Sequence, residues 1–229
     1  WKTEWEAKGE QFDLASVVPP EVPGDQNFAK SVLFGPLFDR DAEGNPRDQA
    51  AHDMATDRFA LQRAPRDTLG WRHGQRRDFA AWEAALLKQD APPAKGAKPV
   101  DTVLAALEPY AADMATLAND VRRSHSRFEI RYEDTFAALL PHLQVMKTAA
   151  KLYSLRASAR LAKGDTATAL RDTVTTIHMA ESFANEPLLI SQLVRVAILQ
   201  IAMQPFWEGA IDHKWSAVHL ASLREALQP

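Results

Sequence analysis

The sequence predicts an all-α protein, either a helical bundle or a short repeat-like array of helices with an irregular, proline-rich N-terminal strap. Apolar residues recur at intervals of three and four along most of residues 101–229, which is the spacing of amphipathic helices. Helix breakers are concentrated in the first hundred residues, which hold nine of the 14 prolines and seven of the nine glycines. We therefore expect irregular structure first and nearly continuous helix afterwards.

Composition excludes several classes of protein. With 229 residues, 46% of them hydrophobic and 25% charged, the chain is long and apolar enough to bury a core. Its formal net charge of −3 suits neither an acidic disordered tail nor a nucleic-acid binder that relies on excess Lys and Arg. No apolar run approaches the roughly 18–20 residues that span a bilayer. The absence of cysteine excludes disulfides and thiolate zinc sites.

Three parts are expected along the chain. Residues 1–47 form the strap, because three prolines within 17–23 fix their own φ and disfavour the α region in the preceding residues. Residues 48–100 hold short helices and loops, with a linker at 91–99 that is rich in proline. Residues 101–229 form the main helical domain.

The middle part is expected to contain two short helices, near 48–62 and 78–89, and the second has Asp78 as its N-cap. The main domain then opens with an amphipathic helix from Asp101 to Val121, because apolar residues recur at intervals of three and four along this stretch.

Residues 127–132 alternate polar and apolar side chains, which favours an extended stretch. A long helical region follows, capped by Asp134 or Thr135 and reaching Lys163. We expect a kink or a break at Pro141, because proline removes a backbone hydrogen bond and clashes with the preceding turn.

The last helices are marked by their ends. Gly164 suits the left-handed position that closes one helix, and Asp165 caps the next, which reaches about residue 184. Pro187 is expected at the first position of a further helix, where its missing N–H has no cost. Ser216 caps the final helix.

The turn at Gly164 resembles the helical hairpin of tetratricopeptide repeats. Those repeats pack small residues between paired helices around a Gly-Asp turn, a pattern that Leu155, Ala159, Leu161, Gly164, Asp165, Ala169 and Leu170 follow here. No further copies occur at a period of about 34 residues, and a solenoid needs roughly three. The resemblance therefore implies one repeat-like hairpin.

A second resemblance is carried by segments 5–10, 19–23, 27–29, 186–195 and 207–209. These segments are similar to an uncharacterised family of bacterial proteins that carry one N-terminal membrane helix ahead of a soluble helical body. The resemblance implies a membrane-anchored protein on the extracytoplasmic side of the cell envelope. It supplies no catalytic residue.

The first six residues mix indoles with charged side chains. Trp and Lys are enriched where a membrane helix meets the lipid headgroups, so this segment suits a juxtamembrane stalk with its anchor upstream of Trp1. An ordinary helical N-terminus with two partly buried Trp residues explains the same pattern.

The most apolar stretch of the chain, 187–203, is expected at the centre of the bundle, and it contains Arg195 and Gln192. A guanidinium there must find a partner, because it keeps its charge and is costly to bury alone. The two side chains suit an anion-binding pocket. Pairing of Arg195 with Glu181, Glu186 or Glu208 is the structural alternative.

Two further groups of residues are candidates for a site. His178 and Glu181 lie three residues apart on one helical face and suit an acid–base pair, although two groups alone do not make a metal site. Arg122, Arg123, Arg127 and Arg131 form the densest basic stretch and suit phosphate or anionic headgroups. They also lie where a helix should end, and cations there are favoured by the helix dipole.

We therefore expect a non-catalytic interaction or scaffold module, displayed at a membrane surface, that binds a protein or peptide between helices. The alternative is an enzyme or small-ligand-binding protein with a pocket beside Arg195, and a spacer with neither property is a third reading. No cofactor, metal or nucleic acid is expected, because the sequence has no Gly-rich phosphate loop, zinc helix or nucleophile elbow. An open apolar groove beside a saturated Arg195 would favour the interaction module.

Overall fold

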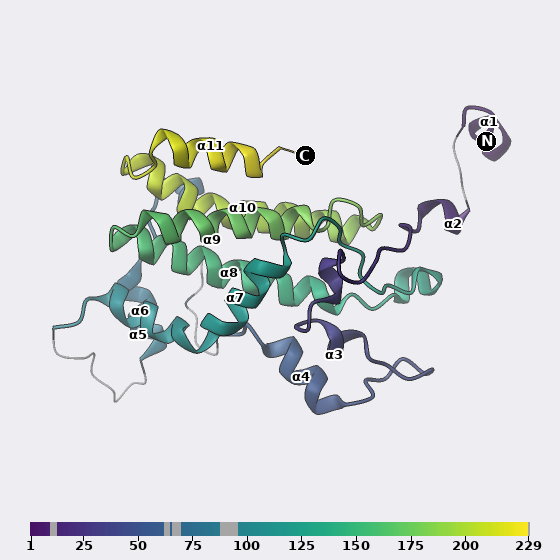
Figure 1. The fold of residues 1–229 in the computed structure, drawn as a ribbon, viewed down its shortest axis with the longest axis horizontal. Coiled ribbons are helices and arrows are strands. Elements are labelled where there is room, and N and C mark those ends of the chain that lie inside the picture. Colours follow the sequence, from purple (N-terminus) through teal and green to yellow (C-terminus); the bar gives the residue numbers. More distant parts are fainter. Residues whose placement is uncertain (10–12, 62–64, 66–69, 88–95, 229) are drawn as a thin grey trace.

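The computed structural model describes residues 1–9, 13–61, 65, 70–87 and 96–228, and it is all-α (Figure 1). Within these ranges there is no β-strand, and only two isolated bridges form, Asn27 with His125 and Arg40 with Pro46. The helices are α1 (Lys2–Glu6), α2 (Leu14–Val17), α3 (Gly35–Phe38), α4 (Gln49–Asp57), α5 (Phe79–Leu86), α6 (Pro99–Leu107), α7 (Ala111–Asp120), α8 (Pro141–Ala162), α9 (Thr166–Glu181), α10 (Leu189–Ile211) and α11 (Ala217–Ala226). Four 3₁₀ turns accompany them: η1 (Phe28–Lys30), η2 (Gly70–His73), η3 (Glu108–Tyr110) and η4 (Tyr132–Ala137).

The centre of the bundle is α8, and the expectation that the 187–203 stretch is central is wrong. Fourteen of the 22 residues of α8 are buried, against eight of the 23 in α10. Helix α8 contacts α9, α10 and α6, and many of its buried positions are Ala or Ser, which allow neighbours to approach on several sides. Figure 1 shows α8, α9, α10 and α11 stacked with similar axis directions.

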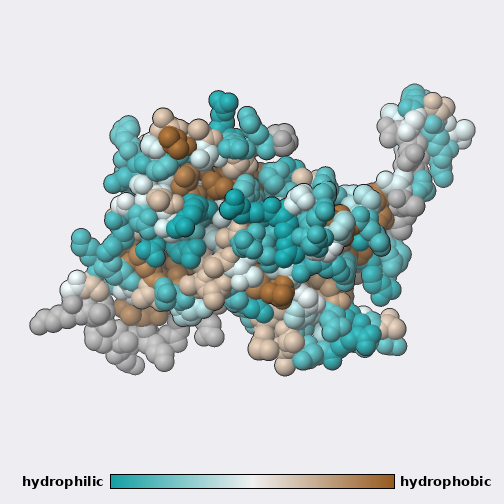
Figure 2. Space-filling model, viewed as in Figure 1, coloured by the Kyte–Doolittle hydropathy of each residue, from teal (hydrophilic) through white to brown (hydrophobic). Residues whose placement is uncertain are grey.

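Helix α10 is nevertheless unusually apolar. Among the described residues it is the one helix that is long and apolar enough to cross a membrane by length and composition, with 23 residues and a mean hydropathy of 1.3. The expectation that no stretch reaches that length is therefore wrong, although core helices of soluble proteins can be equally long and apolar. Figure 2 shows a mainly hydrophilic face, with small hydrophobic groups over α11 and the adjoining part of α10.

Several predicted helix ends are confirmed. The chain breaks at Pro141, which occupies the first turn of α8. Gly164 has φ +83°, a left-handed conformation that side chains rarely adopt, and the Asp165 carboxylate accepts a hydrogen bond from the Thr168 N–H at 3.1 Å. Asp78 and Ser216 likewise cap α5 and α11.

Other boundaries differ from expectation. Residues 101–121 do not form one helix, because Pro109 interrupts the backbone hydrogen bonds and the 3₁₀ turn η3 separates α6 from α7. Helix α10 begins at Leu189 rather than at Pro187, with Leu188 as its N-cap residue. Most of the predicted linker, 91–99, lies outside the described residues.

The C-terminal part of the strap contributes to the main core. Phe28 and Phe34 pack edge-to-face with Phe128, at ring-centroid distances of 6.1 and 5.4 Å. Asn27 is 3% exposed, and its side chain bonds both the N–H and the carbonyl of Arg127, each at 2.9 Å. Burial follows the alternation at 127–132, because Phe128, Ile130 and Tyr132 are buried between more exposed neighbours; residues 127–131 are not helical, and η4 begins at Tyr132.

Polar residues of α10 hold the segment that begins at η2. The Gln204 side-chain oxygen accepts a hydrogen bond from the Trp71 N–H at 2.8 Å, and the Glu208 carboxylate accepts one from the Arg77 N–H at 2.7 Å. Gln200 accepts from the Arg72 guanidinium at 2.7 Å. These three positions are spaced four apart, so residues 70–77 cover this face along the C-terminal half of α10.

Candidate functional site

Arg195 is paired, and the pairing links α9 to α10. Its guanidinium donates to both carboxylate oxygens of Glu181, at 2.9 and 3.1 Å, and lies 3.5 Å from the Gln192 side-chain oxygen. The Gln192 amide donates to the carbonyls of Phe183 and Glu186, at 2.8 and 2.7 Å, which fixes the turn between the helices. Of the three acids considered for Arg195, Glu181 is therefore the partner, and the pair has a structural explanation.

Glu186 is engaged elsewhere, in a contact that the sequence did not suggest. Its carboxylate lies 2.9 Å from the imidazole of His142, and both side chains are almost fully buried. The His142 ring stacks on Phe128 at a centroid distance of 4.0 Å. A lone histidine after a helix-starting proline carries no sequence signal for such a pair, since its partner is 44 residues away.

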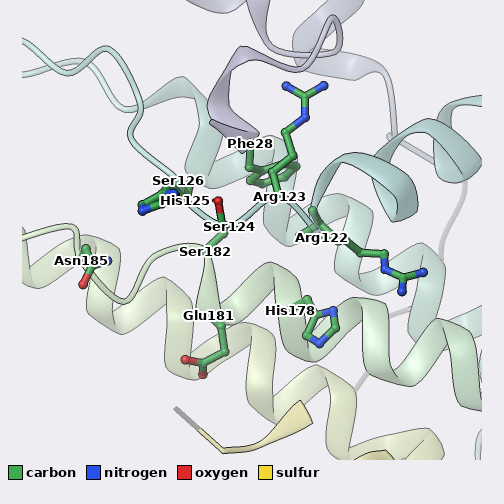
Figure 3. A pocket seen from close by; sticks show the side chains of 11 residues that line it. Phe28, Arg122, Arg123, Ser124, His125, Ser126, His178, Glu181, Ser182 and Asn185 are labelled. Atoms are coloured by element: carbon green, nitrogen blue, oxygen red, sulfur yellow. Dashed lines mark hydrogen bonds between the residues drawn. The ribbon is translucent and has the colours of Figure 1, made fainter. Parts of the chain in front are cut away.

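His178, Glu181, Arg122 and Arg123 come together at one hollow, as Figure 3 shows. We name this hollow of about 340 Å³ the α9 pocket; it lies between the C-terminal turns of α9 and the loop that follows α7. Its lining is Phe28, Val121, Arg122, Arg123, Ser124, His125, Ser126, His178, Glu181, Ser182 and Asn185. Two of the predicted groups are thus neighbours, although 55 residues of sequence separate them.

The charged side chains of the α9 pocket point in different directions. Arg122 and His178 extend toward the same side of it, whereas the Arg123 guanidinium and the Glu181 carboxylate turn away (Figure 3). Arg123 donates to Asp120 and to the Asn27 carbonyl, both at 3.0 Å. Burial lowers the pKa of His178 below its ordinary 6.5; the positive charge of Arg122 lowers that pKa further, and Glu181 opposes the shift.

The basic stretch does not form a single anion patch. Arg127 donates to the Pro19 carbonyl at 2.8 Å and so fastens the strap. Arg131 pairs with Glu133 and Asp134 and lines a different hollow. Arg123 pairs with Asp120 at the end of α7, and only Arg122 of the four has no side-chain hydrogen bond or ion pair to another described residue.

A second hollow lies between α8 and α10, and residues outside the predicted site line it. Four cations, Arg72, Arg77, Lys147 and Lys151, border this space of about 370 Å³, which we name the α8–α10 groove. Among the described residues that line it there is no carboxylate.

The cations of the α8–α10 groove are partly held in place. Arg72 donates to Gln200 at 2.7 Å, and Arg77 donates to the Ser154 hydroxyl at 3.0 Å. Lys147 and Lys151 lie one turn apart on α8, and neither pairs with a described acid. Lys147 and Lys151 therefore place positive charge at the rim that no described acid offsets.

The floor of the α8–α10 groove is apolar and open. Leu193 and Val196 line it and are 56% and 53% exposed, and Leu189 continues the row with 76% exposed. Spacings of four and three place these side chains on one face of α10. Large apolar side chains in such a row are unusual on a surface unless they mark a contact site.

No family model, curated protein or solved structure matches the chain. Among the described residues, no group of three or more His, Asp or Glu side chains is placed to hold a metal ion.

Proposed function

We propose that this chain is a helical interaction module that binds an acidic, amphipathic helix of a partner protein in the α8–α10 groove. The observation that carries the proposal is the exposed apolar row of Leu189, Leu193 and Val196 beside Lys147 and Lys151, which pair with no described acid. Apolar contact would supply affinity, at roughly 1.5–3 kcal/mol for each large side chain fully buried. The cations would select acidic partners and accelerate their association.

A helix suits this groove better than an extended peptide does. The described part of the chain offers no strand and hence no sheet edge to which a peptide strand could add. The row from Leu189 to Val196 covers about 10 Å at 1.5 Å per residue, which matches roughly two turns of a partner helix. Lys147 and Lys151 flank it at the same helical spacing.

The state of Arg195 supports binding of a protein segment over binding of a small ligand at that residue. Its guanidinium is bound by both oxygens of Glu181, so an anion there would compete with a partner already in place. At the same time an apolar groove is open on the same helix. This combination favours the interaction module.

The proposal includes display at a membrane surface in a bacterial cell envelope. Helix α1 has no buried residue, exposes Trp1 and Trp5, and lies away from the helical body in Figure 1. Indoles with neighbouring lysines suit a lipid headgroup region. Flotation with anionic vesicles tests this part, and a Trp1→Ser/Trp5→Ser variant that floats as well as the native chain would contradict it.

Binding of three designed peptides tests the groove. One amphipathic helical sequence is made in acidic, uncharged and basic forms, and its affinity is measured by fluorescence anisotropy. We expect the acidic form to bind at least tenfold more tightly than the basic form. Leu193→Ser/Val196→Ser should weaken binding at least tenfold, because the apolar contact is lost, whereas Val218→Ser on exposed α11 should not.

Charge reversal makes the test sharper. Lys147→Glu/Lys151→Glu should shift the preference toward the basic peptide, since the rim would then attract cations. Equal binding of the three peptides, or unchanged binding by the Leu193→Ser/Val196→Ser variant, would overturn the proposal. Binding of anionic vesicles through Leu193 and Lys147 without binding of the acidic peptide would assign the groove to lipid instead.

A further inference from the structure

The α9 pocket contains polar groups that the fold does not use. Nine of its eleven lining residues are polar, and several of these are committed to the fold: Arg123 to Asp120, Glu181 to Arg195, and Ser182 to the Met179 carbonyl. Others are not. Within the described residues, the side chains of Arg122, His178 and Asn185 have no hydrogen bond, and the buried Ser126 hydroxyl has no partner.

The unused groups are mainly hydrogen-bond donors. Arg122 carries a permanent positive charge, and His178 becomes a cation when protonated. Ser126 and Asn185 add neutral donors on the other side of the pocket, near His125. Of these groups the Ser126 hydroxyl is buried, and a buried donor without a partner costs roughly 1–3 kcal/mol in free energy, so an acceptor that reaches it is favoured.

The one carboxylate of the pocket does not oppose an anion strongly. Glu181 is held by Arg195 at 2.9 and 3.1 Å, and its oxygens turn away from Arg122 and His178 (Figure 3). Its charge is thus offset by a guanidinium on α10. Arg122 therefore leaves a positive charge beside His178 that no described acid pairs with.

We propose that the α9 pocket binds an oxyanion, the phosphate or carboxylate group of a small polar molecule, through Arg122 and His178. The volume of about 340 Å³ exceeds that of a bare anion and leaves room for a polar body against Ser126 and Asn185. This site is separate from the α8–α10 groove, so it goes beyond the function proposed above. No chemical step is assigned to it.

Binding should be coupled to protonation of His178. The charged groups that face this imidazole are Arg122 from the loop and Glu181 from its own helix, with Arg123 and His125 further along the pocket. A bound anion adds negative charge beside the ring, which raises its pKa. Affinity should therefore rise as pH falls toward the ordinary histidine value of 6.5.

Nuclear magnetic resonance of the His178 ring tests the site in the full chain. Inorganic phosphate and succinate are titrated separately, at about 0.15 M NaCl so that unspecific attraction is screened. We expect a saturable shift of the His178 resonances and an upward shift of its pKa with at least one of the two anions. Which anion gives the tighter binding distinguishes a phosphate ligand from a carboxylate ligand.

Two variants complete the experiment. Arg122→Gln should weaken binding at least tenfold, whereas Arg171→Gln, an exposed arginine on α9 that does not line the pocket, should leave it unchanged. A Ser126→Ala variant removes a neutral donor on the opposite side of the pocket, and it should weaken anion binding less than Arg122→Gln does. The absence of a saturable shift for both anions, or equal affinities of the Arg122→Gln variant and the native chain, would overturn the proposal.

Discussion

Two arginines show how ion pairing determines which cations are available to a ligand. Arg195 was the most conspicuous charge in an apolar stretch, and it is bound by Glu181. Arg122 was one of several arginines in a basic run, and it alone of the four faces the α9 pocket without a described partner. Both residues are arginines, so their different pairing depends on where a carboxylate lies in the folded structure.

His178 should make stability depend on pH. Its folded pKa lies below 6.5 because of burial and Arg122, whereas the unfolded chain has the ordinary value. Between those two values the unfolded state binds more protons, so stability falls as pH drops below about 6.5. His178→Gln should therefore flatten the pH dependence of the urea midpoint between about pH 7.5 and about pH 5.5. An unchanged slope in the variant would show that His178 titrates as an exposed histidine.

Gly209 lies inside α10 because the Trp215 ring leaves no room for a side chain there. A Cβ atom there would lie 2.6 Å from Cζ2 of Trp215 and closer still to the neighbouring ring atoms. Gly209→Ala should lower the free energy of unfolding by about 1–3 kcal/mol, despite the better helix propensity of alanine. Gly35→Ala in α3 is the control, because nothing lies within 4 Å of its added Cβ. Equal urea midpoints for the two variants would contradict the contact.

Hydropathy alone does not predict which helix lies at the centre of the bundle. The high apolar content of α10 suggests a central helix, but α8, with its many Ala and Ser residues, is the one enclosed on several sides. Small side chains allow close packing without raising hydropathy greatly. The two faces of α10 consequently differ, since one packs on α8 and α9 and the other carries Leu189, Leu193 and Val196 into solvent.

Two substitutions on α10 check this division. Ile198 is fully buried, so Ile198→Ala should lower the free energy of unfolding by about 2–5 kcal/mol. Leu193 is 56% exposed, so Leu193→Ala should change it by no more than about 0.5 kcal/mol. Chemical denaturation of both variants measures the difference. A large loss for Leu193→Ala would mean that this face of α10 is covered in the native protein.

The assembly of distant segments produces both hollows. The α9 pocket joins the loop after α7 to the end of α9, and the α8–α10 groove joins η2 to α8 and α10. The strap takes part as well, since Asn27 and Phe28 fasten to the 125–128 stretch beside the α9 pocket. Each hollow thus depends on contacts between residues many positions apart.

Local patterns predicted much of the architecture. The all-α class, the break at Pro141, the turn at Gly164, the caps at Asp78, Asp165 and Ser216 and the alternation at 127–132 follow from periodicity and from the backbone preferences of single residues. Such signals act within a few residues. The break at Pro109, which divides the stretch that was expected to be one helix, has the same local cause.

Tertiary packing alone decided which helix is central, which acid pairs with Arg195 and which cations remain available to a ligand. Glu181, Glu186 and Glu208 were equal candidates in the sequence, but each accepts from a different donor: Arg195, His142 and the Arg77 backbone. Lys147 and Lys151 became candidates only through the neighbouring face of α10. Burial and pairing depend on residues that are close in space but distant in sequence. The first and last residues of a helix depend instead on residues that are adjacent in sequence.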